Sequence, residues 1–306
     1  MGEQLQMSIS RTENVKRNIC YSYIGTILTS VFSVICRTIF VYKLGADYLG
    51  VSGLFANVLG VLSFTELGIG SAIVFALYRP IADNDREKIK SLLALYKRAY
   101  QLIALIVATI GILLLPFLRA LVNTEIPLSE IRIYYLVFLF NTVSSYFVSY
   151  KTSYVSALQM EYVVTNTTTV GTIITNVFQI ILLLAGGDYL GYLLVAAIIG
   201  LIQKIATVFY LNIKFPILTE KNIKALDSET KSSIWKNVKA LIIHKVGDVS
   251  VNQTDNIIIS AFVSTTAVGL LSNYTTLNTL ISTFTNKFFG SFTASFGNML
   301  AKESIE

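Results

Sequence analysis

Long apolar stretches, separated by short polar connections, recur along the whole chain. A helix that crosses a bilayer needs about 20 mostly apolar residues, and eight stretches reach that length. The predicted spans are 19–42, 50–78, 92–118, 132–155, 162–185, 189–211, 237–262 and 266–290. The pattern therefore predicts an all-α polytopic membrane protein with about eight transmembrane helices.

The polar segments divide these spans into groups. Residues 1–18 are polar, and the longest polar connection, 212–236, separates the sixth span from the seventh. We expect a six-helix lobe over 19–211, a linker or surface helix over 212–236, and the first two helices of a second lobe over 237–306. Residues 1–18 are too polar, and the first span too long, to predict a cleavable signal peptide.

Composition supports a membrane protein over a soluble one. Hydrophobic residues make up 54% of the chain, charged residues 14%, and the mean hydropathy is +0.64. A soluble domain carries roughly 25% charged residues, because its surface must be covered with polar atoms. With one His and two Cys, no metal site and no other cofactor is expected.

The distribution of basic residues predicts the orientation. If the N-terminus lies inside, the internal segments hold 16 of the 24 Lys and Arg residues and the external connections hold 3. Such an excess is the positive-inside pattern, so the N-terminal segment is expected in the cytoplasm. Most of the net charge of +6 then reflects topology and contact with anionic lipids, not a nucleic-acid partner.

Polar residues recur at helical spacing inside five spans. Lipid tails cannot satisfy such side chains, so they face other helices or a hydrated cavity. Ser and Thr stripes alone are equally typical of packing seams between helices. The stripes are Ser22, Thr26, Thr29, Ser33 and Arg37; Asn141, Ser145, Ser149, Thr152 and Ser156; Thr165, Thr168, Thr172, Asn176 and Gln179; Lys245, Asp248, Asn252 and Asp255; and Asn273, Thr276, Thr283 and Lys287.

Basic residues within spans are more informative, because a charge at mid-bilayer costs roughly 2.5–3.5 kcal/mol even on a lenient scale. We expect Arg37 to line the shared cavity, the alternative being that it snorkels toward the outer interface. Lys204 and Lys287 lie near the predicted cytoplasmic ends of their spans. We expect both to snorkel to the interface.

Acidic residues within spans leave two interpretations open. Asp248 and Asp255 share one face of the seventh span with Asn252 and Lys245. The two carboxylates either line the pathway or form a structural pair with Lys245. Glu66, in the second span, serves either the pathway or helix packing.

A weak internal repeat relates the first span pair to the last. Residues 48–55 (YLGVSGLF) follow the first span, and residues 267–274 (AVGLLSNY) follow the seventh. Superposing Gly50 on Gly269 places Arg37 on Asn256, beside Asp255. Two parallel six-helix halves are a known transporter plan, with the substrate site near the midplane between the halves.

Several segments carry a resemblance to a known family. The run from Arg11 to Asp85, which contains YLGVSGLF, FTELGIGSAI and LYRPIA, and the segment NQTDNIIIS in the seventh span resemble Wzx-type flippases of bacterial polysaccharide synthesis, within the MATE-like superfamily. The resemblance implies two six-helix lobes around a central cavity in the bacterial cell membrane. A full member would continue beyond Glu306 by about four helices, so the chain is expected to be a fragment, a frameshifted product or a split protein.

The resemblance also implies a substrate and a mechanism. The substrate would be an undecaprenyl-pyrophosphate-linked oligosaccharide, moved from the inner to the outer leaflet by alternating access, and other polysaccharide assembly proteins would be partners. Arg37 would offset pyrophosphate charge by bidentate hydrogen bonding, while amides and hydroxyls would replace the hydration of the sugars. The expected substrate residues are Arg37, Thr168, Thr172, Asn176 and Gln179, and the expected residues for coupling to Na⁺ or H⁺ are Asp248, Asn252 and Asp255.

Three other functions were weighed against this one. A multidrug or small-cation antiporter of the same superfamily would need carboxylates and aromatics in the cavity, and Arg37 opposes that. A membrane enzyme would need convergent acids in a loop, but Asp47, Glu125, Glu130 and Asp188 form no motif, so no enzyme is predicted. An inactive truncated fragment is the third.

Overall fold

The computed structural model describes residues 11–63, 69–220 and 254–302, with scattered residues between 226 and 247. All the elements in the described residues are helices. They are α1 (Arg11–Leu44), α2 (Ala46–Leu62), α3 (Ile69–Ala82), α4 (Arg86–Leu113), α5 (Leu118–Leu121), α6 (Leu128–Ala157), α7 (Glu161–Leu184), α8 (Tyr189–Lys214), α10 (Asp255–Phe262) and α11 (Thr265–Lys302), with 3-10 turns at Leu115–Phe117 and Pro216–Leu218.

Five helical segments in the described residues are long and apolar enough to cross a membrane. They are Cys20–Leu44, Arg86–Leu121, Leu128–Ala157, Glu161–Leu184 and Tyr189–Lys214. These correspond to the first, third, fourth, fifth and sixth predicted spans. Together with the shorter apolar helices Ala46–Leu62 and Ala72–Ala82, they indicate a multi-pass membrane protein.

The second predicted span is wrong as a single helix. Residues 50–78 belong to two helices, because α2 ends at Leu62 and α3 begins at Ile69. The sequence between them is rich in Ser, Thr and Gly, which favour helices less than the flanking apolar residues do. Of the seventh predicted span, 237–262, the structure describes a helix only over α10, and the eighth, 266–290, lies within α11. The proposed division into lobes and linker stays a prediction.

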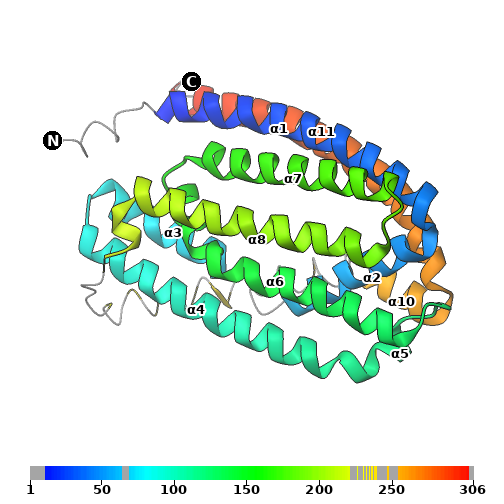
Figure 1. Ribbon diagram of the computed structural model, residues 1–306. Helices are drawn as coiled ribbons and strands as arrows, with labels where there is room; N and C mark the ends of the chain where they lie inside the picture. Colours follow the sequence, from blue (N-terminus) through cyan, green and yellow to red (C-terminus); the bar gives the residue numbers. More distant parts are fainter. Residues whose placement is uncertain are drawn as a thin grey trace.

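The long helices lie side by side in the order α1, α7, α8, α6 and α4, and α11 runs along α1 (Figure 1). We call one end of this bundle the Gly45 end, after the turn between α1 and α2, and the opposite end, where α4 begins, the Arg86 end. The turns at Gly45 and Gly186 have φ of +90° and +85°, which glycine adopts without steric cost.

Large apolar side chains cover the outward faces of the bundle. On α7 these include Val170, Ile174, Phe178 and Ile181, each between 41% and 57% exposed. The spacing of these residues places them along one face of the helix. In water such a face would be an unusually large hydrophobic patch, whereas in a bilayer it meets lipid tails.

Helices α2 and α11 cross at the Gly45 end with their backbones almost in contact. A Cβ on Gly50 would lie 1.9 Å from the Thr265 carbonyl oxygen, and one on Gly269 would lie 2.1 Å from the Ala46 carbonyl oxygen. The two contacts are reciprocal: adding the repeat offset of 219 to Ala46 and Gly50 gives Thr265 and Gly269. Exchanged contacts of this kind are typical of surfaces related by a two-fold axis, so the crossing supports the repeat that the sequence predicts.

Neutral hydrogen bonds extend this joint around the Gly45 end. Thr266 donates from its hydroxyl to the Asp47 carboxylate, again at an offset of 219. The Ser260 hydroxyl donates to the Leu121 carbonyl at 2.8 Å, and the Thr265 amide donates to the Asn123 carbonyl at 3.0 Å. Helices α10 and α11 are therefore fastened both to α2 and to the segment that follows α5.

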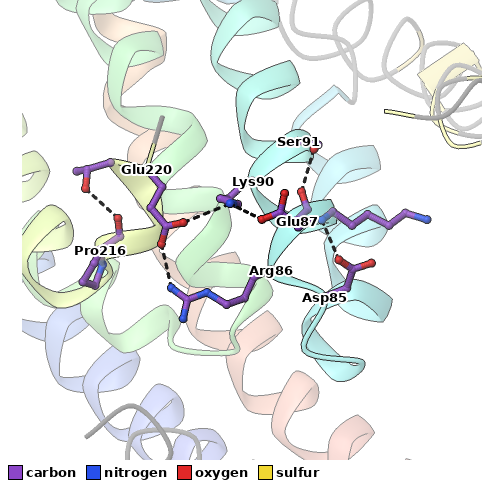
Figure 2. A network of polar contacts seen from close by, with 9 residues as sticks. Asp85, Arg86, Glu87, Lys90, Ser91, Pro216 and Glu220 are labelled. Atoms are coloured by element: carbon purple, nitrogen blue, oxygen red, sulfur yellow. Dashed lines mark hydrogen bonds and ion pairs between the residues drawn. The ribbon is translucent and has the colours of Figure 1, made fainter. Parts of the chain in front are cut away.

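The Arg86 end carries a network of charged groups (Figure 2). Glu220, just beyond α8, accepts from Arg86 at 2.9 Å and lies 3.4 Å from the Lys90 ammonium. Lys90 also pairs with Glu87, and Asp85 caps α4 by accepting from the Lys88 amide. The hydrogen bond from Arg86 lowers the pKa of Glu220, partly opposed by burial. The network ties the beginning of the predicted linker to the first turns of α4.

Candidate substrate cavity

A cavity of about 390 Å³ lies among α1, α2, α6, α7, α8 and α11, toward the Gly45 end. Its wall mixes polar groups with aliphatic and aromatic side chains. The lining residues are Ser30, Ser33, Val34, Cys36, Arg37, Phe40, Leu49, Ser52, Val137, Phe138, Asn141, Asn176, Gln179, Tyr192, Leu193, Ala196, Thr276 and Leu280.

Two buried amides of α7 form part of the polar wall. Asn176, 8% exposed, donates to the Ser33 hydroxyl at 3.1 Å. Gln179, 4% exposed, donates to the Tyr192 carbonyl at 3.1 Å and accepts from the Cys36 thiol at 3.7 Å. These bonds fix both amides. Each amide has two N–H donors and a carbonyl acceptor, so hydrogen-bonding capacity remains for a ligand.

The Arg37 guanidinium is the cationic group of the cavity wall. Its Nε donates to the Asn273 Oδ1 at 3.0 Å, and its Nη2 donates to the Ser272 hydroxyl at 2.7 Å. Both acceptors are neutral and lie on α11. Within the described part of the chain, no carboxylate lies within ion-pair distance of Arg37. Arg37 therefore links α1 to α11 while its charge stays uncompensated by an acidic side chain.

Aromatic rings fill the space between the cavity and the Gly45 end. Phe40 packs against Tyr192 with ring centroids 4.8 Å apart, and Tyr189 packs against Tyr48 at 4.8 Å and Tyr134 at 4.7 Å. The Tyr189 hydroxyl lies 2.7 Å from the Ser52 hydroxyl. This cluster separates the cavity from the turns at that end with large, closely packed side chains.

The family model for polysaccharide biosynthesis proteins matches residues 15–294. The chain belongs to this family. A solved structure described as protein A has the same fold, with a TM-score of 0.68 at 12% sequence identity. The match covers 90% of this chain and 62% of the solved chain. No curated protein matches the sequence significantly.

Membership in the polysaccharide biosynthesis protein family is consistent with a membrane transporter role in polysaccharide export, and the predicted substrate residues can be placed in that light. The structure brings Arg37, Asn176 and Gln179 together in the cavity wall. Thr168 and Thr172 lie outside that wall, and the Thr168 hydroxyl donates to carbonyls one turn earlier in α7. The eight residues from Thr168 to Asn176 rise by about 12 Å and rotate by about 80°, which takes Thr168 out of reach.

The residues predicted to couple transport to an ion are largely untested. Asp255 is exposed and is the first residue of α10. Lys245, Asp248 and Asn252 lie outside the described residues, as does Glu66. Coupling through the acidic groups of the seventh span stays a prediction.

Four polar lining residues were not assigned to the site from the sequence. Asn141 and Thr276 belong to predicted stripes, but their stripes gave no reason to choose them over their neighbours. Ser52 and Tyr192 lie in apolar contexts, where an aromatic ring or a lone hydroxyl is typical of packing. For Tyr192 the available signal was its position one turn after Tyr189, in an α8 segment otherwise composed of aliphatic residues and glycine.

Proposed function

We propose that this chain forms the substrate cavity of a transporter that moves pyrophosphate-linked lipid oligosaccharides across the bacterial cell membrane. The supporting observation is Arg37, a cation with neutral hydrogen-bond partners in a cavity also lined by buried amides. Polar sugars and a pyrophosphate cannot cross hydrocarbon without such groups, because every lost hydration bond must be replaced.

Arg37 suits the pyrophosphate group of such a substrate. A guanidinium binds phosphate oxygens through paired, charge-assisted hydrogen bonds, which are stronger than bonds to neutral oxygens. An anion in the cavity would therefore compete with Ser272 and Asn273 for the same donors. Binding would release α11 from α1, which gives substrate occupancy a direct effect on the contact between the two predicted lobes.

The remaining polar lining suits sugars. Asn141, Asn176 and Gln179 provide amide donors and acceptors that match hydroxyl groups. Because such groups bind many sugars, the proposal extends to the class of lipid-linked oligosaccharide and not to one repeat unit. Transport would proceed by rocking of the lobes, with the Arg86 end in the cytoplasm, as the basic residues favour.

Binding of a short-chain polyprenyl pyrophosphate to the purified chain in nanodiscs tests the proposal. We expect the ligand to raise the thermal melting midpoint of the protein, and the matching uncharged polyprenol to have little effect. Arg37→Met should weaken binding by at least about tenfold, which corresponds to about 1.4 kcal/mol. Arg37→Lys, which keeps the charge but loses the paired geometry, should fall between the two.

Expression in a strain that lacks its polysaccharide flippase tests the transport step, with membrane insertion checked by labelling. Restored surface polysaccharide that is lost with Arg37→Met would support the role of Arg37 in transport. Equal binding of the pyrophosphate by the wild-type chain and by Arg37→Met would refute it. Preferential binding of a lipophilic cation would favour a multidrug antiporter instead, although the described cavity lining contains no carboxylate.

A further inference from the structure

Lys204 lies within α8, well away from both ends of the helix. Its ammonium donates to the Asn141 carbonyl oxygen at 3.1 Å and to the Ser144 hydroxyl at 2.7 Å, both on α6. The side chain is half-buried in the seam between the two helices. The prediction that Lys204 snorkels to an interface is therefore not supported, because its charged group is held inside the bundle.

Lys204 shares its bonding pattern with Arg37 and Lys151. Lys151, only 5% exposed, donates to the Asn212 side-chain oxygen on α8. In the part of the chain that the structure describes, these three cations have neutral oxygen partners and no carboxylate within ion-pair distance. Arg86 and Lys90, at the surface, do have one in Glu220. Uncompensated charge inside a membrane protein is costly and usually marks an ion or substrate pathway.

The three cations are spaced along the length of the bundle. Gln203, beside Lys204, packs against Gly171 of α7, where a Cβ would lie 2.3 Å from the Gln203 oxygen. Cys36, beside Arg37, contacts Gln179 of the same helix. The eight residues from Gly171 to Gln179 rise by about 12 Å, and the eight from Lys204 to Asn212, the partner of Lys151, rise by about another 12 Å.

Asn141 connects Lys204 with the cavity. Its carbonyl oxygen accepts from Lys204, and the residue also lines the cavity that contains Arg37. Across the seam, a Cβ on Gly200 would meet only the Asn141 Oδ1 within 4 Å, at 3.7 Å. The α8 surface between the cavity and Lys204 is therefore loosely packed compared with the crossings at Gly171 or Gly50.

We propose that Lys204, Ser144 and Asn141 form a second binding site for a phosphate-type oxyanion, between the Arg37 cavity and the Arg86 end. An ammonium has three N–H donors, and two are used in the bonds to α6. The third donor, with the Ser144 hydroxyl, provides the anion contact. A pyrophosphate is too short to reach Arg37 and Lys204 together, so the two sites are occupied in succession. This site rests on the proposed function, since it lies on the same route.

The experiment titrates nanodisc-embedded protein with a short-chain polyprenyl pyrophosphate and, separately, with inorganic pyrophosphate, and follows the melting midpoint. Lys204→Met should weaken binding by about tenfold, whereas Lys204→Arg should retain most of it. Lys214→Met is the matched control, because Lys214 is exposed in the last turn of the same helix. That control should bind as the wild type does.

A measurement on the wild-type chain guards against a variant that folds poorly. Lysine acetylation with a small reagent, quantified by mass spectrometry, should modify Lys204 several-fold more slowly when ligand is present, while Lys214 reacts at an unchanged rate. Protection by inorganic pyrophosphate as well would assign the site to the phosphate group alone. Protection by the prenylated ligand only would assign it to a lipid headgroup.

The outcomes separate this site from the proposed function. Binding that falls with Arg37→Met but not with Lys204→Met, with no protection of Lys204, would overturn the second site and leave the proposed function intact. Binding that falls with Lys204→Met but not with Arg37→Met would do the reverse, supporting the second site against the role proposed for Arg37.

Discussion

The Gly45 end of the bundle is joined by close backbone contact, whereas the Arg86 end is joined by charge. At the Gly45 end, Gly50 and Gly269 allow α2 and α11 to touch, and neutral hydrogen bonds surround the crossing. At the Arg86 end, Glu220 binds Arg86 and Lys90 through side chains that include strongly exposed groups. One contact depends on shape and the other on charge.

The difference predicts how each end responds to change. Steric contact at van der Waals distance leaves no room for added atoms, so the Gly45 end should tolerate substitution poorly and be insensitive to salt. Ion pairs between exposed groups contribute little and are screened by salt, so the Arg86 end should tolerate substitution and respond to salt and pH. The joint between the predicted lobes is thus the stiffer of the two.

The largest effect is expected from Gly50→Ala. The new Cβ would lie 1.9 Å from the Thr265 carbonyl oxygen, and a backbone atom of the facing helix cannot rotate away. The helices must separate, so the destabilisation should reach or exceed the upper end of the roughly 1–3 kcal/mol seen for overpacking. The measurement is the free energy of unfolding in mixed micelles, by titration with SDS.

Gly53→Ala is the matched control on the same helix. A Cβ there would lie 3.4 Å from the Val268 Cγ1, which is an ordinary contact. Because alanine favours a helix over glycine by roughly 0.5–1 kcal/mol, this variant should be neutral or slightly stabilised. Equal destabilisation by the two substitutions would show that the close crossing of α2 and α11 does not form in the protein.

The same comparison shows which parts of the fold the sequence could predict. Lengths of apolar sequence located α1, α4, α6, α7 and α8, because the bilayer imposes a minimum length on any spanning helix. Hydropathy did not detect the division between α2 and α3, since Gly, Ser and Thr interrupt a helix without making the segment polar. The repeat was predictable from Gly50 and Gly269, but the contact between those two residues was not.

The cavity was predictable where charge or amide groups were involved. Arg37, Asn176 and Gln179 stood out because such groups are costly to place against lipid. Thr168 and Thr172 were assigned too readily: successive i, i+4 steps drift around a helix by about 40° each, so a long stripe does not face one cavity. Tyr192 was missed because an aromatic residue contributes to an apolar pattern while its hydroxyl remains polar.

A smaller effect is expected from Thr266→Val. The substitution preserves the side-chain shape but removes the hydroxyl that donates to Asp47 across the joint. A typical hydrogen bond contributes about 0.5–1.5 kcal/mol, and exposure places this one at the lower end. Thr275→Val is the control, since the Thr275 hydroxyl bonds only within α11, to the Ser272 carbonyl. If the two variants lose the same stability, the Asp47 bond does not strengthen the joint.

The smallest effect is expected from Glu220→Gln at the Arg86 end. Arg86 lowers the pKa of Glu220, so the pair stabilises the folded protein above the ordinary glutamate pKa of about 4.3 and loses that contribution as the pH falls through the lower, folded value. The wild type should therefore melt slightly above Glu220→Gln at pH 7, and the gap should close in strong acid or at high salt. Asp83→Asn, in the more exposed Arg79 pair, should show a still smaller gap. A gap that persisted in strong acid and at high salt would mean that Glu220 acts through packing, and the two ends of the bundle would then be held by the same kind of contact.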